Sequence, residues 1–219
     1  MKRLMNSIEK MLLRIWWLYS YEVNNPILKN ISLEAASALN VRPFNKIKIS
    51  DKFPLVNAAV VGFRCRTIVL TETLLELMNI EELKAIFLHE YAHCKQKHQT
   101  KLLTISLLIL ILTMLPTSLI FLEIDSELIS ISLLALMICT AYIIMLSIAR
   151  YLTRRFEFEA DLIAVEASRN PVVYIDMLKK LKIFEARPSR KSLTSIFRSH
   201  PYIEERIKKI IEASIKHIS

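Results

Sequence analysis

The residues best suited to chemistry are two histidines and a glutamate that lie close together in the chain. The stretch His89-Glu90-Tyr91-Ala92-His93 has the pattern H-E-x-x-H inside a segment with helical periodicity. Residues four apart lie one turn apart on the same helix face, so both imidazoles can reach one Zn²⁺ at roughly 2.0–2.1 Å. Glu90 is rotated from His89 by about 100° around the axis. It is therefore a candidate general base for the water that the metal activates. Two surface histidines on a helix are the alternative.

A catalytic zinc needs a third protein ligand and one open coordination position. The best candidates lie in the stretch Glu157-Phe158-Glu159-Ala160-Asp161. Glu157 and Asp161 are again four apart on one helical face, so one can bind the metal while the other orients a histidine from behind. Glu159 points elsewhere by the helical period, and we expect it to be solvated.

Two uncharged runs, residues 102–122 and 128–149, separate these two stretches. About 20 apolar residues cross a bilayer as a helix, so we expect a transmembrane hairpin with the acidic segment 123–127 as its outer loop. A buried hairpin in a soluble core is the alternative. Two crossings return the chain to the same side, where His93 and Glu157 can share a metal. Cationic flanks predict a cytoplasmic active site in a two-span protein of the cell membrane. These flanking residues are Lys95, Lys97, Lys101, Arg150, Arg154 and Arg155.

The composition agrees with a helical chain bound to a membrane. Hydrophobic residues make up 53% of the chain, and the formal net charge is +9. The only glycine, Gly62, excludes the phosphate-binding loops that need at least two glycines. The basic excess fits an anionic inner leaflet, and no basic-aromatic interleaving points to a nucleic-acid partner. Cys65, Cys94 and Cys139 are widely spaced, which predicts free thiols facing a reducing cytosol.

The polar segments predict a mostly helical α+β domain that the transmembrane hairpin interrupts. Asn79 and Glu82 form a predicted capping box at the start of the helix that carries the two histidines, and we expect this helix to continue into the first span. Strands are expected at residues 46–50, 56–61 and 67–70. Further helices are expected at residues 32–39, 71–78, 151–169, 171–186 and 203–218.

Four parts follow from this organisation. They are an amphipathic N-terminal helix at 1–30, the first half of a metallopeptidase domain at 31–101, the transmembrane hairpin at 102–149 and the second half of the domain at 150–219. The N-terminal helix can lie on a membrane surface or pack on the protein core.

These features together resemble the gluzincin-type membrane metallopeptidases that include HtpX and the CAAX prenyl endopeptidase. The H-E-x-x-H stretch is one of several matching segments that cover about residues 46–212. The others are an Asn-Ala-x-x-x-Gly edge strand at 57–62, a strand-to-helix passage at 68–75, Glu-x-x-Ala-Asp at 157–161, and Ser199-His200-Pro201 followed by Glu205-Arg206-Ile207.

The resemblance implies a zincin-type fold with a small β-sheet and one Zn²⁺ per chain. It implies three zinc ligands, which are His89, His93 and Glu157. It also implies that Glu90 is the general base and that Asp161 orients a ligand from behind. His200 becomes a candidate for stabilising the tetrahedral oxyanion.

The resemblance also implies an edge strand that pairs with an extended substrate backbone. This strand would contain Asn57, Ala58, Ala59 and Val60. The partners expected are therefore a protein or peptide substrate and the lipid bilayer.

The expected function is that of a membrane-bound, zinc-dependent endopeptidase that hydrolyses peptide bonds of membrane or misfolded proteins. Two spans cannot build the multi-span chamber of the CAAX endopeptidase, so we do not expect prenyl-protein processing. A catalytically inactive membrane scaffold or binding protein of the same fold is the alternative. A receptor with an extracellular sensor is disfavoured by the short outer loop. His98 and His217 are expected to be solvated, and Cys94 to be a packed thiol.

Overall fold

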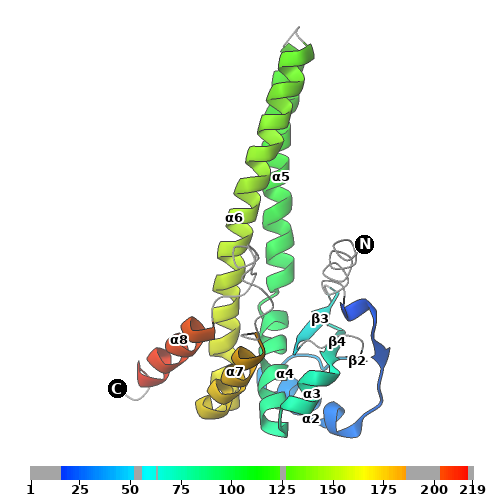
Figure 1. Cartoon of the computed structure of the whole chain (residues 1–219), viewed down its shortest axis with the longest axis vertical. Coiled ribbons are helices and arrows are strands. Elements are labelled where there is room, and N and C mark those ends of the chain that lie inside the picture. The colour runs from blue at the N-terminus through cyan, green and yellow to red at the C-terminus, as the bar shows by residue number, and fades with distance from the viewer. Residues whose placement is uncertain (1–15, 52–55, 63, 124–126, 186–202, 217–219) are drawn as a thin grey trace, which may run out of the picture.

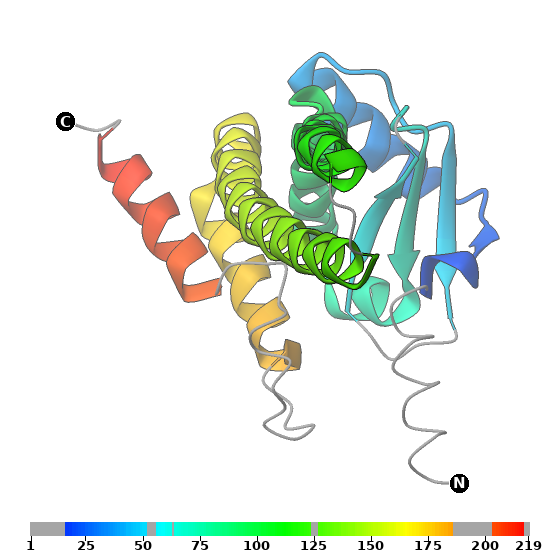
Figure 2. The same cartoon turned by 90° about the horizontal axis from the view of Figure 1, so that it is seen from above.

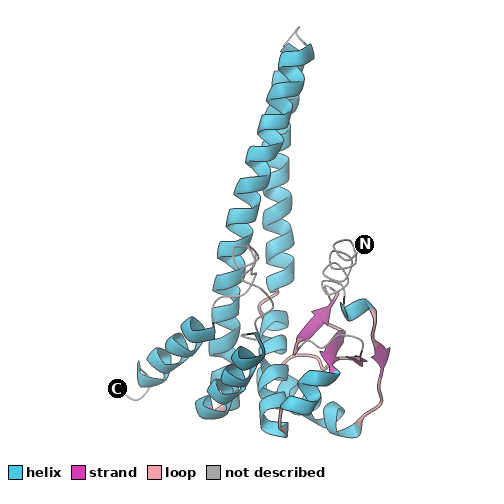
Figure 3. Cartoon of the chain, in the orientation of Figure 1, coloured by secondary structure: helices cyan, strands magenta, loops and turns pink. Residues whose placement is uncertain are grey.

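The structure is a computed structural model, and it describes residues 16–51, 56–62, 64–123, 127–185 and 203–216. A small sheet lies beside a group of helices, and a long helical hairpin rises from both (Figure 1). The strands are confined to one side of the molecule, and the remainder is mostly helix (Figure 3). This confirms the mostly helical α+β fold with two apolar helices that the sequence predicts.

The sheet has four strands in the order β1-β2-β4-β3. Their bounds are β1 Tyr21–Glu22, β2 Lys46–Ser50, β3 Ala58–Val61 and β4 Thr67–Thr71. Strands β2 and β4 are parallel, whereas β1 and β3 pair antiparallel with their neighbours. The three predicted strands are present within two residues of their expected bounds. Strand β3 lies at an edge of the sheet, as the resemblance implies.

Seven α-helices complete the described chain. They are α2 Pro26–Leu39, α3 Glu72–Leu77, α4 Ile80–Lys95, α5 His98–Glu123, α6 Glu127–Ser168, α7 Pro171–Glu185 and α8 Ile203–Lys216. Seen from above, the sheet lies on one side of the α5–α6 hairpin, and α7 and α8 lie on the other (Figure 2). Residues 1–15 of the predicted N-terminal helix are outside the described residues. The 3-10 helix Trp16–Leu18 and strand β1 follow them.

Helix α4 is the central helix of the soluble part. Its N-terminus carries the predicted capping box, with both Asn79–Glu82 hydrogen bonds at 2.9 Å. The side chains of Phe87, Leu88 and Ala92 are fully buried. Helix α4 packs against α2 on one side and α6 on the other. Its rotation about its own axis is therefore fixed by packing, and so is the face that it turns toward α6.

Tyr91 anchors α4 from within the H-E-x-x-H stretch. Its ring stacks on Phe44 with centroids 4.1 Å apart. Its hydroxyl lies 2.6 Å from Ser32 Oγ and accepts a hydrogen bond from the backbone N–H of Phe44 at 2.8 Å. A buried hydroxyl needs such partners, because leaving it without any costs about 1–3 kcal/mol. The residues between the two histidines therefore hold the helix to the core.

Helix α4 ends before α5 begins, so the expected continuous helix from residue 79 into the first span is wrong. Lys97 adopts a left-handed conformation with φ 54°, and His98 begins α5. Helices commonly end at a glycine in the left-handed conformation, but here the left-handed residue is a lysine. The sequence therefore carries no glycine or proline that would mark the end of the helix. The break redirects the chain and turns His98 back toward α6.

Helices α5 and α6 form the hairpin. Both are long and apolar enough to cross a membrane, within His98–Leu115 and Ile131–Ser168, and the most apolar 18-residue stretch of each is almost entirely unburied. Helix α6 continues without a break from the hairpin into the soluble part, whereas we expected separate segments at 128–149 and 151–169. The same rigid element therefore carries the second apolar run and residues 157–161.

A disulfide joins Cys65, in the turn before β4, to Cys94, near the end of α4. The expectation of free thiols is therefore wrong for these two cysteines, and Cys94 is not a packed thiol. Their Cα atoms lie 5.9 Å apart, within the range that a disulfide requires. The sequence gives no sign of this pairing, because 29 residues separate the two positions and the sheet brings them together. Cys139 is free and exposed on the hairpin.

Candidate metal centre

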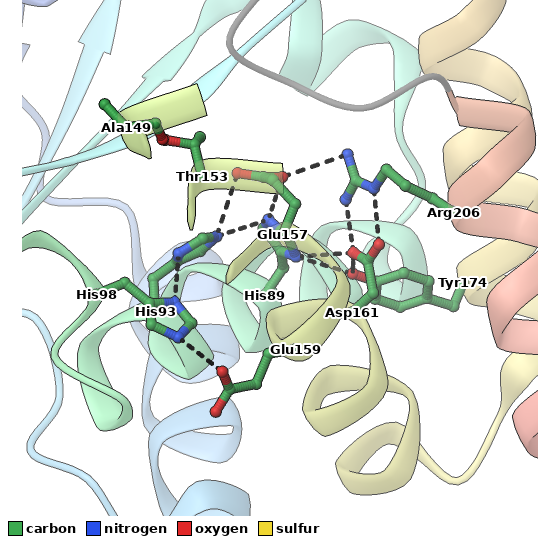
Figure 4. Close-up of polar contacts among 10 residues, drawn as sticks. All are labelled: His89, His93, His98, Ala149, Thr153, Glu157, Glu159, Asp161, Tyr174 and Arg206. Atoms are coloured by element: carbon green, nitrogen blue, oxygen red, sulfur yellow. Dashed lines mark hydrogen bonds and ion pairs between the residues drawn. The ribbon is translucent and has the colours of Figure 1, made fainter. Parts of the chain in front are cut away.

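Helix α4 presents His89 and His93 on the face that it turns toward α6. Their Nε2 atoms lie 3.2 Å apart, as expected for two rings one helical turn apart. Only 12% of the His89 side chain and 21% of the His93 side chain are exposed. Two imidazoles are thus held next to each other with their Nε2 atoms pointing to the same place (Figure 4).

Helix α6 brings Glu157 to this pair. Its Oε2 lies 3.6 Å from His89 Nε2 and its Oε1 lies 3.6 Å from His93 Nε2. Ligand atoms at about 2.0–2.1 Å from a tetrahedral zinc ion are about 3.3 Å from one another. The separations of 3.2 and 3.6 Å match this value, and all three donor atoms lie within 4.8 Å of one another. The donor set of two imidazoles and a carboxylate therefore fits a zinc ion.

Asp161 lies one turn further along α6, behind His89. Its Oδ1 is 3.1 Å from His89 Nδ1, the ring nitrogen that points away from Glu157. The structure thus brings Glu157 to the two Nε2 atoms and Asp161 to the rear of His89. These are the positions that the resemblance implies for the two carboxylates.

Tyr174 and Arg206 surround Asp161 and were not identified as site residues from the sequence. Tyr174 Oη donates a hydrogen bond to Asp161 Oδ1 at 2.8 Å and lies 3.0 Å from His89 Nδ1. The Arg206 guanidinium binds the carboxylate through two N–H groups at 2.7 and 2.6 Å. Tyr174 comes from α7 and Arg206 from α8, so the last two helices reach the site through Asp161. Arg206 belongs to a segment that carries the resemblance, which was the one available signal.

Burial and the neighbouring charges shift the pKa values of His89 and His93 in opposite directions. Burial alone would lower the pKa of His89, but the hydrogen bonds and charges of Asp161 and Glu157 raise it to about 10. Burial and the neighbouring His89 charge lower the pKa of His93 to about 3. A metal ion that binds here therefore displaces a proton from His89 and meets His93 already neutral.

His98 and Glu159 form a second group, behind His93. His98 is 3% exposed, and its Nδ1 lies 3.0 Å from His93 Nδ1. Its Nε2 lies 3.4 Å from Glu159 Oε2. The expectation that His98 is solvated is therefore wrong, and the Glu159 carboxylate, though partly exposed, is turned toward this ring. The break at Lys97 explains the error, because a continuous helix would place residue 98 differently.

The remaining predicted residues are placed as follows. Glu90 is half-buried on α4 beside His89. Asn57 precedes β3, and Ala58, Ala59 and Val60 belong to this edge strand. His200 and His217 lie outside the described residues.

The comparisons with known proteins agree with this geometry. The model of Peptidase family M48 matches residues 22–214. A protein named "Protease HtpX homolog" from Bacteroides fragilis (strain YCH46) is 23% identical over an alignment that covers 88% of this chain and 76% of that protein. Another of the same name, from Streptococcus pyogenes serotype M28 (strain MGAS6180), is 28% identical and aligns with 72% of this chain and 64% of its own length.

A solved structure extends the comparison to the fold. The crystal structure of S. mikatae Ste24p matches 94% of this chain with a TM-score of 0.67 and 19% sequence identity. The alignment covers 55% of Ste24p, so this chain spans about half of that protein's length. The two chains share a fold across nearly the whole of the shorter one.

Proposed function

Because the chain belongs to peptidase family M48, over residues 22–214, we propose that it is a membrane-bound, zinc-dependent endopeptidase. The family and the HtpX relatives support a membrane metallopeptidase. The observation that carries the finer proposal is the convergence of His89, His93 and Glu157 from two helices. Two imidazoles and one carboxylate are the protein ligands of many catalytic zinc sites, with one position left open. We propose one Zn²⁺ per chain on these three residues.

When bound, a zinc ion supplies a Lewis acid that polarises the peptide carbonyl and makes a water molecule more acidic. Glu90 accepts the proton from the attacking water and delivers it to the departing nitrogen. Asp161, held by Arg206 and Tyr174, fixes the ring of His89 and keeps a negative charge behind it. We keep His200 as the residue that would stabilise the oxyanion.

The substrate would bind as an extended strand along the free edge of β3. The Asn57 carbonyl accepts the Thr71 N–H of β4, so the backbone groups of Ala58 and Val60, in alternating register, face away from β4. In the structure the Val60 carbonyl accepts a hydrogen bond from the Gln99 side chain at 3.2 Å. A substrate backbone would replace that side chain and add a strand to the sheet. Membrane or misfolded proteins supply such extended segments.

Zinc and proteolysis are tested together by purifying the full chain in detergent and comparing it with Glu90→Gln. We expect the wild type to bind one zinc and to cleave casein or itself, and a chelator to abolish cleavage. The Glu90→Gln protein should keep its zinc and lose turnover, because the amide cannot accept the proton. The control is Glu166→Gln, an exposed residue on α6, which should behave as the wild type.

Two outcomes would contradict the proposal. A wild-type protein that binds no zinc would refute the metal site. Equal behaviour of wild type and Glu90→Gln, with zinc bound and no cleavage, would favour a catalytically inactive membrane scaffold of the same fold.

A further inference from the structure

We propose that His98 is a positioning residue that fixes the ring of the metal ligand His93, and that Glu159 fixes His98 in turn. The relevant contacts are the 3.0 Å separation of His98 Nδ1 from His93 Nδ1 and the 3.4 Å separation of His98 Nε2 from Glu159 Oε2. The inference rests on the proposed metal site and concerns how that site is held.

The first step concerns the proton on His93. Its Nε2 faces His89 and Glu157, so a metal bound to this set would use the Nε2 lone pair. A neutral imidazole carries one N–H, which must then be on Nδ1. A metal-binding histidine donates this second N–H to a carboxylate, a carbonyl or a water molecule, which sets the orientation of the ring. For His93 the atom in that position is His98 Nδ1.

The second step follows from the capacity of each atom to donate or accept. If His93 Nδ1–H donates, His98 Nδ1 must accept, and the proton of His98 is then on Nε2. His98 Nε2 is buried without a hydrogen bond to any described residue, and it lies 3.4 Å from Glu159 Oε2, which belongs to an ionised carboxylate that can only accept. One arrangement of protons therefore suits all three side chains. The same arrangement leaves His93 Nε2 free to bind the metal.

The third step is that His98 is held rigidly. Its ring stacks on Phe156 with the centroids 4.2 Å apart and the planes inclined by 8°. It is the first residue of α5, directly after the left-handed Lys97, and is almost completely buried. A buried, stacked ring loses little further freedom when it accepts a hydrogen bond. Phe156 and Glu159 both belong to α6, so α4, α5 and α6 meet at this ring.

This arrangement differs from the one behind His89. There the acceptor is the Asp161 carboxylate, which carries a charge that Arg206 compensates. Behind His93 the acceptor is a neutral ring. His98 therefore supplies direction more than charge, and its loss should lower metal affinity and alter ligand geometry. A purely structural His98 would instead contribute only its stacking on Phe156.

Two substitutions separate these roles. His98→Phe keeps an aromatic ring that can stack on Phe156 but removes the acceptor. His98→Asn loses the stacking but places an amide oxygen near the position of Nδ1. Zinc affinity is measured by competition with a chelator, and ligand geometry by the visible absorption spectrum of the Co²⁺-loaded protein. Loss of an outer partner of this kind typically lowers metal affinity about 10–100-fold.

We expect His98→Phe to lose at least about tenfold in zinc affinity and to show a changed Co²⁺ spectrum. His98→Asn should recover most of the affinity and the wild-type spectrum. Glu159→Ala, at a partly exposed position where the fold tolerates change, should shift both readouts in the same direction as His98→Phe. The matched control is Glu166→Ala, an exposed carboxylate on the same helix, which should shift neither.

Wild-type zinc affinity and spectrum in a folded His98→Phe protein would overturn the proposal. So would a His98→Asn protein as weak as His98→Phe. If His98→Phe does not fold, Glu159→Ala decides, because unchanged affinity there means that the carboxylate does not hold the ring. These results are distinct from failure of the proposed function, in which the wild type itself would bind no zinc.

Discussion

The two carboxylates on α6 have different surroundings, although the helix places both beside His89. Glu157 lies 3.6 Å from both Nε2 atoms. Asp161 is bound by two N–H groups of Arg206 and by Tyr174. Arg206 also lies 3.6 Å from Glu157 Oε2, but this contact is longer than its two hydrogen bonds to Asp161. The closer contact of Arg206 with Asp161, and the two imidazoles that face Glu157, are why we propose Glu157 as the metal ligand and Asp161 as the residue behind His89.

Glu157→Ala tests that assignment. We expect the purified protein to lose most of its zinc, because two imidazoles alone leave a site with two open positions. The metal content is measured after gel filtration in detergent, beside wild type and Glu90→Gln. Asp161→Asn, which keeps an acceptor behind His89, should lower zinc affinity by about tenfold and retain the site. Unchanged zinc content in Glu157→Ala would mean that another residue is the third ligand.

The pair Asp161 and Arg206 should also be important for stability. Both side chains are buried, so Arg206→Met would leave a buried carboxylate without its cation. Breaking such a pair costs about 3–5 kcal/mol. We expect the zinc-loaded Arg206→Met protein to unfold at a clearly lower temperature than the wild type. Lys208→Met, whose side chain is 77% exposed, is the control and should change little. Equal unfolding temperatures for both variants would refute this role.

How far the site could be predicted depends on the range of the contacts. His89, Glu90 and His93 are predictable because one helical turn fixes their relation. Glu157 and Asp161 share the same regularity, so each pair of positions appears in the sequence. Tyr174 meets His89 from 85 residues away, and no periodicity reports such a contact. His98 was misjudged for a different reason, since its placement depends on a helix break that no sequence signal marks.

At the scale of elements, the break between α4 and α5 positions His98. A left-handed conformation costs a residue with a side chain roughly 1–2 kcal/mol, and glycine is free of that cost. Lys97→Gly should therefore stabilise the protein by about 1 kcal/mol. Lys101→Gly, inside α5, should destabilise it by about 1 kcal/mol, because glycine weakens a helix interior. Thermal unfolding of the two variants would contradict the left-handed break if both lowered the midpoint.

The disulfide joins two elements of the site. It ties the turn before β4 to the end of α4, one residue after His93. With 29 residues of separation, loop closure predicts that the crosslink stabilises the fold by about 3–4 kcal/mol. We expect a reductant to lower the unfolding temperature of the wild type. Cys65→Ser should lower it equally, and the reductant should then add nothing. A wild type that is insensitive to reductant would refute the contribution of this bond.

The elements that the sequence did not predict were missed for separate physical reasons. Strands β2 and β4 are parallel neighbours with β-branched and apolar residues, so their pattern is clear. Strand β1 has only two residues, too few for any alternation to be visible. The unity of α6 was missed because its hydropathy changes at residue 150 while its backbone does not. A change in hydropathy along one helix therefore looked in the sequence like the end of one helix and the start of another.

At the scale of the whole molecule, the continuous α6 couples the membrane hairpin to the metal site. Glu157 and Asp161 lie on the helix whose apolar part would cross the bilayer. His98 begins the other helix of the hairpin. In the proposed metal site, the two hairpin helices would therefore supply the third ligand, Glu157, and the residue that positions His93.

Two features of the chain give opposite predictions for the side of the membrane on which the site lies. The Lys and Arg flanks of the hairpin predict the cytoplasmic side. A disulfide is more typical of oxidising compartments or of intracellular proteins from hyperthermophiles. We expect the charge rule to decide, because six cations flank the hairpin on the side of the site, within the short range where such charges act. They are Lys95, Lys97, Lys101, Arg150, Arg154 and Arg155.

Cysteine labelling in intact cells resolves this question. In a Cys139→Ser background, Leu128→Cys places a thiol at the loop end of the hairpin and Glu166→Cys places one at the other end of α6, beyond Asp161, both at exposed positions. We expect a membrane-impermeant maleimide to label Leu128→Cys in intact cells and Glu166→Cys only after permeabilisation. The Cys139→Ser parent measures any labelling of Cys65 and Cys94. The reverse pattern would place the site outside the cytoplasm, in the compartment that the disulfide favours.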